Sequence, residues 1–279
     1  MQTIANKVVI LVITHKSELS LYEKISLQQC FNTFSEREIY IICPEGLNIS
    51  EYKAISPDLN IDFIHFRWQS NYQNFNRLKI LPFLYERYKK YEYILFYEPD
   101  AFVFRDELDQ WCDKGFDYAG APWFDGFNSK EGSGDFLGVG NGGFSLRNTA
   151  AHLRVLHSLS YVTSFKENWN SRFVEKRYGK NMLKQAAGLL LDHTIRNNTY
   201  WRFNSYNGHE DQFWGLDVPK VFSWFKKPLY EEAASFAFEM QPRRLYELNN
   251  HQLPFGCHAW WKYDLDFWKP HIEKFGYKL

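Results

Sequence analysis

Hydrophobic residues near the start of the chain form short runs that alternate with helical patterns. Val8 to Thr14 is an unbroken run of β-branched residues and leucine, which is typical of a strand buried on both faces. Shorter runs at Glu38 to Cys43 and Ile61 to Phe66 predict two more strands, and Leu19 to Phe34 carries apolar residues at helical spacing. Strand, helix and strand at these intervals predict an α/β fold with a parallel sheet and right-handed crossovers.

The next segment ends in the first group of residues with evident chemistry. Asn76 to Lys90 is predicted to be a helix kinked at Pro82, and Tyr93 to Tyr97 is predicted to be the fourth strand. That strand runs directly into Glu98-Pro99-Asp100. Because open α/β sheets bind ligands at the carboxyl ends of their strands, these two carboxylates are expected beside a ligand. A short strand and a short helix follow, at Ala101 to Phe104 and Leu108 to Cys112.

The second half of the chain shows no boundary between domains. Asp125 to Gly138 is glycine-rich and polar without periodicity, which predicts a mobile loop able to close as a lid beside a functional surface. Phe144 to Leu146 is predicted to be a strand. The sequence contains no internal repeat, low-complexity tract or linker, so we expect residues 1–279 to form a single domain.

Charge and composition exclude several classes of protein. Lys plus Arg and Asp plus Glu each number 33, so there is no basic surplus for nucleic acid. The longest apolar run, Val8 to Ile13, is far shorter than the roughly 20 residues of a membrane-spanning helix. The polar segment Met1 to Lys7 does not resemble a signal peptide, and a cytoplasmic location is expected.

Cysteine spacing and aromatic content refine this picture only slightly. The four cysteines lie far apart with no C-x-x-C pair, which predicts buried reduced thiols rather than a zinc site or a disulfide framework. Phe, Tyr and Trp make up 19% of the residues, and such rings either fill cores or stack on sugars and bases.

Three further segments carry candidate chemistry, each with an ordinary structural alternative. The dinucleotide-binding pattern G-x-G-x-x-G is matched by Gly138-Val139-Gly140-Asn141-Gly142-Gly143. Because this segment lies in mid-chain before a strand, a dinucleotide site is disfavoured. A tight turn, or a surface of bare backbone that a ligand can approach, is favoured instead. Glu210-Asp211 precedes Phe213-Trp214 and is either a surface pair or a pocket pair that includes a general base. His258, among aromatic residues, is either a core histidine or a metal ligand.

Taken in order, these segments resemble a known class of enzymes. The strings YEPDAFVFRDELDQWCDKGFDYAGAPWF, VGNGGFSLRN, EDQFW and LPFGCHAWWKYD resemble the GT-A nucleotide-sugar glycosyltransferases, and more narrowly a bacterial family of glycosyltransferase-like domains. The resemblance spans Lys7 to Trp268. It implies a GT-A, Rossmann-like mixed sheet, mostly parallel and flanked by helices. It also implies a donor-binding half at about 1–120, an acceptor and catalytic half at about 121–279, and a role in polysaccharide biosynthesis.

The resemblance also implies roles for individual residues. The acidic D-x-D motif falls on Glu98-Pro99-Asp100, so Asp100 would bind a divalent ion, with Glu98 on the ion, its water or the ribose, and His258 would be a further ligand. Asp211 would be the catalytic base of an inverting enzyme, with Glu210 orienting acceptor or donor sugar. Carboxylates, one imidazole and two phosphate oxygens favour Mn²⁺ or Mg²⁺ over zinc.

Other residues are expected to contact the two substrates. On the donor side, the predicted contacts are Thr14, His15, Arg77, Lys79, Gly142, Gly143 and Lys262, together with Glu98 and Asp100. On the acceptor side, the rings expected to stack on sugar and to keep water out are Trp123, Phe124, Trp214 and Trp260.

Several alternatives stay open at this stage. A retaining transferase on the same scaffold would use Asp211 to position the donor, and a carbohydrate-binding protein would need neither metal nor nucleotide. The expected partners are a nucleotide sugar, with UDP as the commonest carrier, and a glycan or lipid-linked glycan. Phe225-Lys226-Lys227 and Lys269 to Lys278 are basic and aromatic, which fits weak contact with the inner face of a membrane or simply a solvated surface. The oligomeric state is open.

Overall fold

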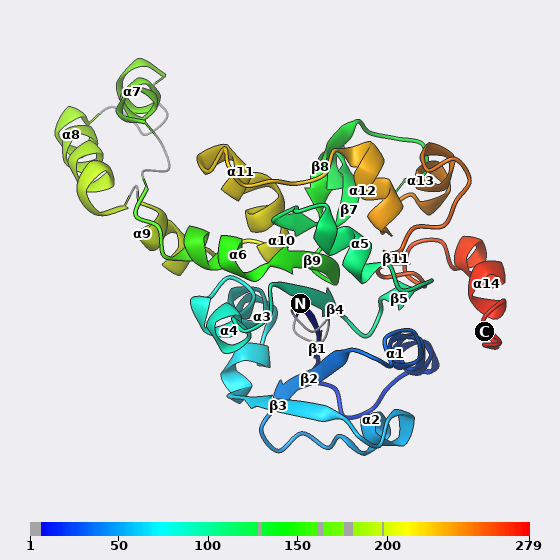
Figure 1. Ribbon diagram of the computed structural model, residues 1–279. Helices are drawn as coiled ribbons and strands as arrows, with labels where there is room; N and C mark the ends of the chain where they lie inside the picture. The colour runs from blue at the N-terminus through cyan, green and yellow to red at the C-terminus, as the bar shows by residue number, and fades with distance from the viewer. Residues whose placement is uncertain (1–6, 128–129, 161–163, 176–180, 197) are drawn as a thin grey trace.

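A six-stranded mixed sheet forms the centre of the protein in a computed structural model that describes residues 7–127, 130–160, 164–175, 181–196 and 198–279 (Figure 1). Its strand order is β3-β2-β1-β4-β9-β6. The first four strands in sequence run parallel, whereas β9 is antiparallel to both of its neighbours. The bounds are β1 (Val8–Ile13), β2 (Glu38–Pro44), β3 (Asn60–Ile64), β4 (Tyr93–Tyr97), β6 (Tyr118–Ala119) and β9 (Phe144–Asn148). The predicted α/β class with a mixed, mostly parallel sheet is confirmed.

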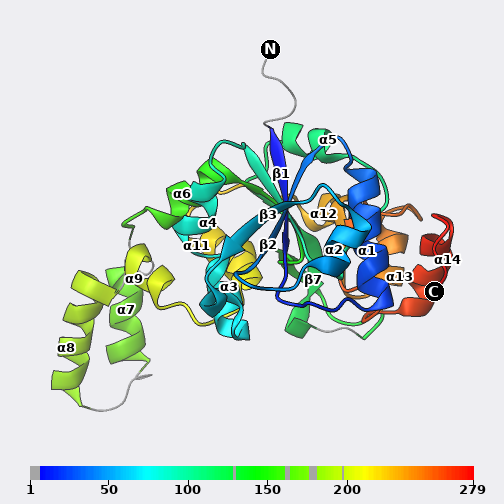
Figure 2. The same ribbon diagram turned by 90° about the horizontal axis from the view of Figure 1, so that it is seen from below.

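Helices cover both faces of this sheet. Figure 2 shows α1 and α2 on one side of β1, and α3, α4 and α6 on the other. In the first half the bounds are α1 (Leu21–Thr33), α2 (Ser50–Ile55), η2 (Phe66–Gln69), α3 (Tyr72–Leu78), α4 (Pro82–Arg87) and α5 (Leu108–Asp113). Ser20 and Glu23 form a capping box that fixes the start of α1.

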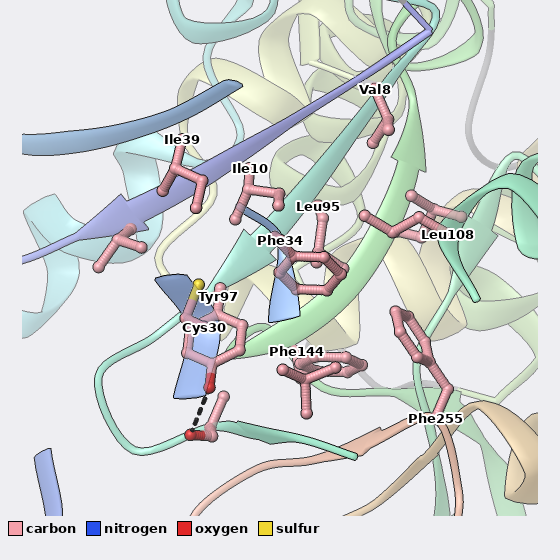
Figure 3. Close-up of a cluster of buried hydrophobic side chains, with 14 of the residues drawn as sticks. Val8, Ile10, Cys30, Phe34, Ile39, Leu95, Tyr97, Leu108, Phe144 and Phe255 are labelled. Carbon is pink, nitrogen blue, oxygen red and sulfur yellow. Dashed lines mark hydrogen bonds between the residues drawn. The ribbon is translucent and has the colours of Figure 1, made fainter. Parts of the chain in front are cut away.

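The central strand β1 is buried on both faces, as its unbroken apolar run predicts. Val8, Ile10 and Val12 face a core built with α1, whereas Val9 and Leu11 face a second core built with α4 and α6. In Figure 3, Phe34, Tyr97, Phe144 and Phe255 pack together in the first of these cores. This double burial makes the sheet a rigid platform for the loops at its carboxyl edge.

Two small sheets accompany the central one, and the larger of them joins the later part of the chain to the segment after β4. The three-stranded sheet has the order β10-β11-β5, with β5 (Phe102–Val103), β10 (Ala237–Phe238) and β11 (Gly256–Cys257). Cys257 lies opposite Phe102 in an antiparallel register, so the next residue, His258, faces the chain that follows Asp100. The other sheet is the hairpin β7 (Ala121–Phe124) and β8 (Phe136–Gly140).

The remaining helices lie in the second half. They are η3 (Asp125–Phe127), α6 (Thr149–Leu156), α7 (Phe165–Trp169), η4 (Asn170–Val174), α8 (Met182–Leu191), η5 (Asp192–Arg196), α9 (Thr199–Asn204), α10 (Glu210–Gln212), η6 (Phe213–Asp217), α11 (Val218–Val221), α12 (Tyr230–Phe236), α13 (Pro242–Leu248) and α14 (Leu265–Glu273). Both views show α7 and α8 standing away from the rest of the protein (Figures 1 and 2).

Two predicted elements differ from those observed. The single helix over Asn76 to Lys90 is wrong, because α3 ends at Leu78 and a new helix begins at Pro82. The proposed loop over Asp125 to Gly138 contains η3 and most of β8, and its segment 130–134 is held by Arg244, which donates to the carbonyl of Gly134 at 2.8 Å. Residues 128 and 129 of that loop lie outside the described residues.

The structure also bears on the state of the cysteines and on the hydropathy of the helices. All four cysteines are buried and free, as predicted from their spacing. Within the described residues, none of the helices combines the length and the hydropathy required to cross a bilayer.

Candidate functional site

A cleft opens at the carboxyl edge of the sheet, between the ends of β1 and β4. Here the strand order reverses, because β2 and β3 follow on one side of β1 and β4 lies on the other. Such a reversal leaves space above the sheet that neither crossover covers. The cleft has a volume of about 490 Å³ and is lined by Ile13, Thr14, His15, Lys16, Glu23, Gln69, Ser70, Asn71, Tyr72, Phe75, Glu98, Pro99, Asp100 and Lys262.

Two potential metal ligands, Glu98 and Asp100, line this cleft, and a third, His258, lies against them without being part of the lining. Glu98 and Asp100 follow β4 directly, and His258 follows β11. One ligand atom from each lies within 4.8 Å of the others. Nε2 of His258 is 3.0 Å from Oδ1 of Asp100 and 3.6 Å from Oε2 of Glu98. Two carboxylates and one imidazole form a donor set that suits Mn²⁺ or Mg²⁺ when phosphate oxygens complete the shell.

The orientation of His258 fits a metal ligand. Its Nδ1 is 2.8 Å from Oε1 of Glu239, and the other oxygen of Glu239 accepts a hydrogen bond from the indole of Trp123 at 3.1 Å. Its Nε2 is buried and makes no directed hydrogen bond, although Oδ1 of Asp100 is near. A carboxylate behind a ligating histidine fixes the ring and leaves the opposite nitrogen for a metal. Glu239, which sequence analysis did not identify, is thus part of the site.

Charges in the cluster shift its pKa values strongly. Burial by itself raises the pKa of Glu98, but the Lys79 ammonium and His258 outweigh burial and hold that pKa at about 2. Burial also opposes ionisation of Asp100, yet His258 holds the pKa of this carboxyl well below its ordinary value. The carboxylates in turn raise the pKa of His258 well above its ordinary value, against the effect of burial. A dication bound by these groups would therefore compete with a proton for His258.

Beneath the cleft lies a buried ionic network of two cations and two carboxylates. Lys79 is 1% exposed and contacts Glu98, Oε1 of Glu210 at 3.3 Å and the carbonyl of Gly142 at 3.1 Å. Arg147 is fully buried and lies 2.9 Å from Oε2 of Glu210. Lys79 and Glu210 are therefore structural partners below the floor of the cleft. The predicted direct contacts of Lys79 with the diphosphate and of Glu210 with a sugar are wrong for this arrangement, because both side chains are sealed from solvent.

Asp211 has a raised pKa, although it is not among the residues that line the cleft. Burial raises its pKa from 3.8 to about 7, and the charges of Glu210 and Glu239 add to that increase. Its Oδ1 accepts a hydrogen bond from the backbone N–H of Gln212 at 2.8 Å. A carboxylate with a pKa near neutrality is a stronger proton acceptor than an ordinary aspartate and is still largely ionised at slightly alkaline pH.

Gly142 and Gly143 provide space, but for side chains of the protein itself. A Cβ on Gly142 would lie 1.9 Å from Oε1 of Glu210, and a Cβ on Gly143 would lie 2.1 Å from Nε2 of His258. The turn before them is made by Asn141, whose φ is 82° and whose side-chain oxygen accepts the N–H of Gly143 at 2.8 Å. The prediction that these glycines leave bare backbone for the donor is therefore replaced by a packing role.

The other predicted donor contacts divide into two groups. Thr14, His15 and Lys262 line the cleft, and Lys262 contacts Oδ2 of Asp100. Arg77 is absent from the lining and donates to the carbonyl of Asn204 at 2.9 Å, so its predicted approach to the diphosphate is wrong in this structure. Sequence analysis missed the aromatic wall of the cleft, formed by Tyr72 and Phe75 at the start of α3.

The four rings expected to contact the acceptor lie in the interior. Trp123 is 2% exposed, and Phe124, Trp214 and Trp260 are fully buried. Each indole N–H has a partner inside the protein: Glu239 for Trp123, the carbonyl of Lys79 for Trp214 and the hydroxyl of Ser26 for Trp260. The prediction that these rings stack on an acceptor sugar is wrong, and two of them instead brace residues of the site.

Three comparisons place the chain among known proteins. No curated protein sequence matches it significantly. Among solved structures, it resembles the galactosyltransferase LgtC in complex with donor and acceptor sugar analogues (12% identity over 90% of this chain and 86% of that chain, TM-score 0.44). It also resembles mouse xyloside xylosyltransferase 1 (11% identity over 91% and 97%, TM-score 0.48) and the glycosyltransferase GlyE of Streptococcus pneumoniae TIGR4 (13% identity over 97% and 63%, TM-score 0.41). A family model described as proteins of unknown function, DUF5672, matches residues 58–258, and the chain belongs to that family.

Proposed function

We propose that this protein is a metal-dependent glycosyltransferase that moves a sugar from a nucleoside-diphosphate sugar to a hydroxyl of a glycan or lipid-linked glycan. The observation that carries the proposal is the cluster of Glu98, Asp100 and His258, of which Glu98 and Asp100 line a cleft at the sheet reversal. Residues 98 and 258 are far apart in sequence, so this cluster requires the pairing of β5 with β11. Asp211, with its pKa of about 7, adds a candidate base from a third segment.

The donor would lie along the cleft. Thr14 and His15 at the end of β1 and the rings of Tyr72 and Phe75 would hold the nucleoside, which we propose to be uridine. Its diphosphate would reach the wall formed by Asp100 and Lys262. Bound there, Mn²⁺ or Mg²⁺ would stabilise the negative charge of the leaving diphosphate.

The protein's own residues would then carry the proton and hold the site. Asp100 and His258 would hold the metal, with Glu98 on the metal or on its water, and Glu239 would keep the ring of His258 in place. Asp211 would accept the proton of the attacking hydroxyl, and an in-line displacement would invert the anomeric centre. The chain would act as one domain, with residues up to about 120 supplying most donor contacts and the rest supplying the base and the third ligand.

A panel of nucleotide sugars tests this function. The protein is incubated in Mn²⁺ with a panel of nucleoside-diphosphate sugars that includes UDP and GDP sugars. Release of the nucleoside diphosphate is measured with and without EDTA. The proposal predicts release with at least one donor, abolished by EDTA and by Asp100→Asn. NMR of the glycoside formed with an acceptor distinguishes inversion from retention. Nucleotide-independent sugar binding with no release from any donor would favour a carbohydrate-binding protein instead.

A further inference from the structure

A helical arm projects from the protein on the side where the strands end. We define the arm as residues 164–175 and 181–196, which contain α7, η4, α8 and η5. Figures 1 and 2 show it separated from the helices that cover the sheet. In Figure 2, β1 runs away from the N-terminus toward the cleft, and the arm extends beside the protein in that same direction. The arm therefore extends toward the end of the molecule at which β1 ends.

The exposed surface of the arm is unusually apolar. Eight of its large apolar side chains are exposed, with exposed fractions from 38% to 84%, and the most exposed are Val174, Met182, Leu183 and Leu190. Isolated exposed apolar residues are normal on soluble proteins, but a contiguous group marks a binding surface.

Polar contacts, in contrast, hold the two helices of the arm together. Arg172 pairs with Asp192 and also donates to the side-chain carbonyl of Gln185 at 3.2 Å. Gln185 is 5% exposed, although it is a polar residue in the middle of α8. Some of the arm's hydrogen bonds and ion pairs therefore lie between its helices, whereas much of its apolar surface is exposed. This arrangement is expected for a pair of helices that binds an apolar surface.

An apolar groove runs between the two helices. It has a volume of about 500 Å³, and the only polar residue among the nine that line it is His193. Its walls include Phe165 and Trp169 from α7 and Leu183 and Leu190 from α8. A groove of this size and polarity accommodates hydrocarbon rather than a hydrated sugar.

The charge of the segment that contains the arm indicates which kind of apolar surface the arm binds. Residues 164–196 contain seven of the 33 Lys and Arg residues of the chain but only three of the 33 Asp and Glu residues, so this segment carries +4 and the rest of the chain −4. Three of the seven cations belong to residues 176–180, which lie outside the described residues and are counted from sequence alone. Aromatic and aliphatic side chains combined with a local cationic excess are complementary to an anionic lipid surface.

We propose that the arm docks this protein on an anionic membrane surface, with the apolar side chains of α7 and α8 inserted among the lipids. The inference is independent of the proposed transferase activity, since it rests on a different part of the molecule. It also moves the expected membrane contact away from Phe225, which is 5% exposed and packs against Trp214.

Vesicle sedimentation tests the proposal with the full chain. The vesicles contain phosphatidylcholine alone, or phosphatidylcholine and phosphatidylglycerol in a two-to-one ratio. Met182→Gln/Leu183→Gln removes apolar surface without adding charge, and glutamine preserves helix propensity in the first turn of α8. Leu229→Gln is the matched control, because Leu229 is 75% exposed but lies outside the arm. Lys166→Gln/Lys184→Gln removes two of the cations.

The proposal predicts that the wild type and Leu229→Gln bind the anionic vesicles, that added salt weakens binding, and that neutral vesicles bind much less. Each double variant should lower the partition coefficient by at least about tenfold while circular dichroism and thermal unfolding stay unchanged. Equal binding by Met182→Gln/Leu183→Gln and wild type would overturn it, as would wild type that stays in the supernatant at low salt. A dimer that the same variant dissociates, with no vesicle binding, would instead make this face an interface between copies.

Discussion

Replacing Gly143 with alanine would place a methyl group where the ring of His258 now lies. The added Cβ would be 2.1 Å from Nε2 and 2.2 Å from Cδ2 of His258. Non-bonded carbon contacts are favourable only at about 3.5 Å and beyond, so the ring would have to retreat by more than about 1 Å. Glu239 holds the other side of that ring at 2.8 Å, and the retreat would compress or break this hydrogen bond.

The expected consequence is a loss of metal affinity with little loss of fold. Metal–ligand distances tolerate deviations of only about 0.2 Å, so a displacement of about 1 Å removes His258 from a shell shared with Asp100. Disturbing the support of a ligating histidine typically costs about 10- to 100-fold in affinity. We therefore expect Gly143→Ala to weaken Mn²⁺ binding by at least about tenfold, measured by calorimetry in the presence of a nucleoside diphosphate.

Gly138→Ala provides the control. Its added Cβ meets only the end of the flexible Leu216 side chain, at 2.7 Å, which can rotate away. This variant should bind Mn²⁺ like the wild type. If Gly143→Ala also bound Mn²⁺ with unchanged affinity, while thermal unfolding showed an intact fold, then the ion would not be held by His258 and the assignment of the metal site would fail.

Further predictions concern the base and the buried charges. Asp211→Asn should lower turnover by about 10²- to 10⁴-fold and leave the affinity for Mn²⁺ and nucleoside diphosphate unchanged; loss of affinity together with turnover would argue for a donor-binding role. Because the base must be ionised and the pKa of Asp211 is about 7, wild-type turnover should rise with pH through neutrality, and the residual turnover of Asp211→Asn should lack that limb. Lys79→Met leaves Glu98 and Glu210 without their shared cation and should cost about 3–5 kcal/mol in the free energy of unfolding, measured by urea denaturation. Lys262→Met, at a side chain 56% exposed, should cost less than about 1 kcal/mol but weaken diphosphate binding; equal destabilisation by the two lysine variants would contradict the buried network.

Elements with a strong local pattern could be predicted well. The fourth strand matches the predicted Tyr93 to Tyr97, and the first differs by one residue, because runs of β-branched, aromatic and leucine residues bounded by polar residues leave little choice. The prediction of one continuous helix through Pro82 was wrong for an equally local reason. Leu81, forced by the following proline out of the helical region, has φ of −86° and ψ of 141°, which ends one helix and starts another.

Part of the site could be predicted from the sequence because its metal-binding side chains lie in turns that follow strands. Glu98, Asp100 and His258 stand next to strand ends, where an acidic or imidazole side chain has few packing roles. The contacts between residues distant in sequence were not visible. Lys79 finds partners 63 and 131 residues away, and nothing in its own neighbourhood distinguishes it from a surface lysine. For the same reason, sequence could not separate the buried tryptophans from the ring of Tyr72, which is 63% exposed beside the cleft.

The most direct test of the metal site is the anomalous diffraction of crystals grown with Mn²⁺ and a nucleoside diphosphate. A metal site at Asp100 and His258 predicts a manganese peak within coordination distance of the Asp100 carboxylate and Nε2 of His258, with the diphosphate on the same ion and the nucleoside beside Thr14 and Tyr72. A diphosphate bound elsewhere, or a cleft that holds the nucleotide with His258 still paired to Asp100 and no metal between them, would contradict it.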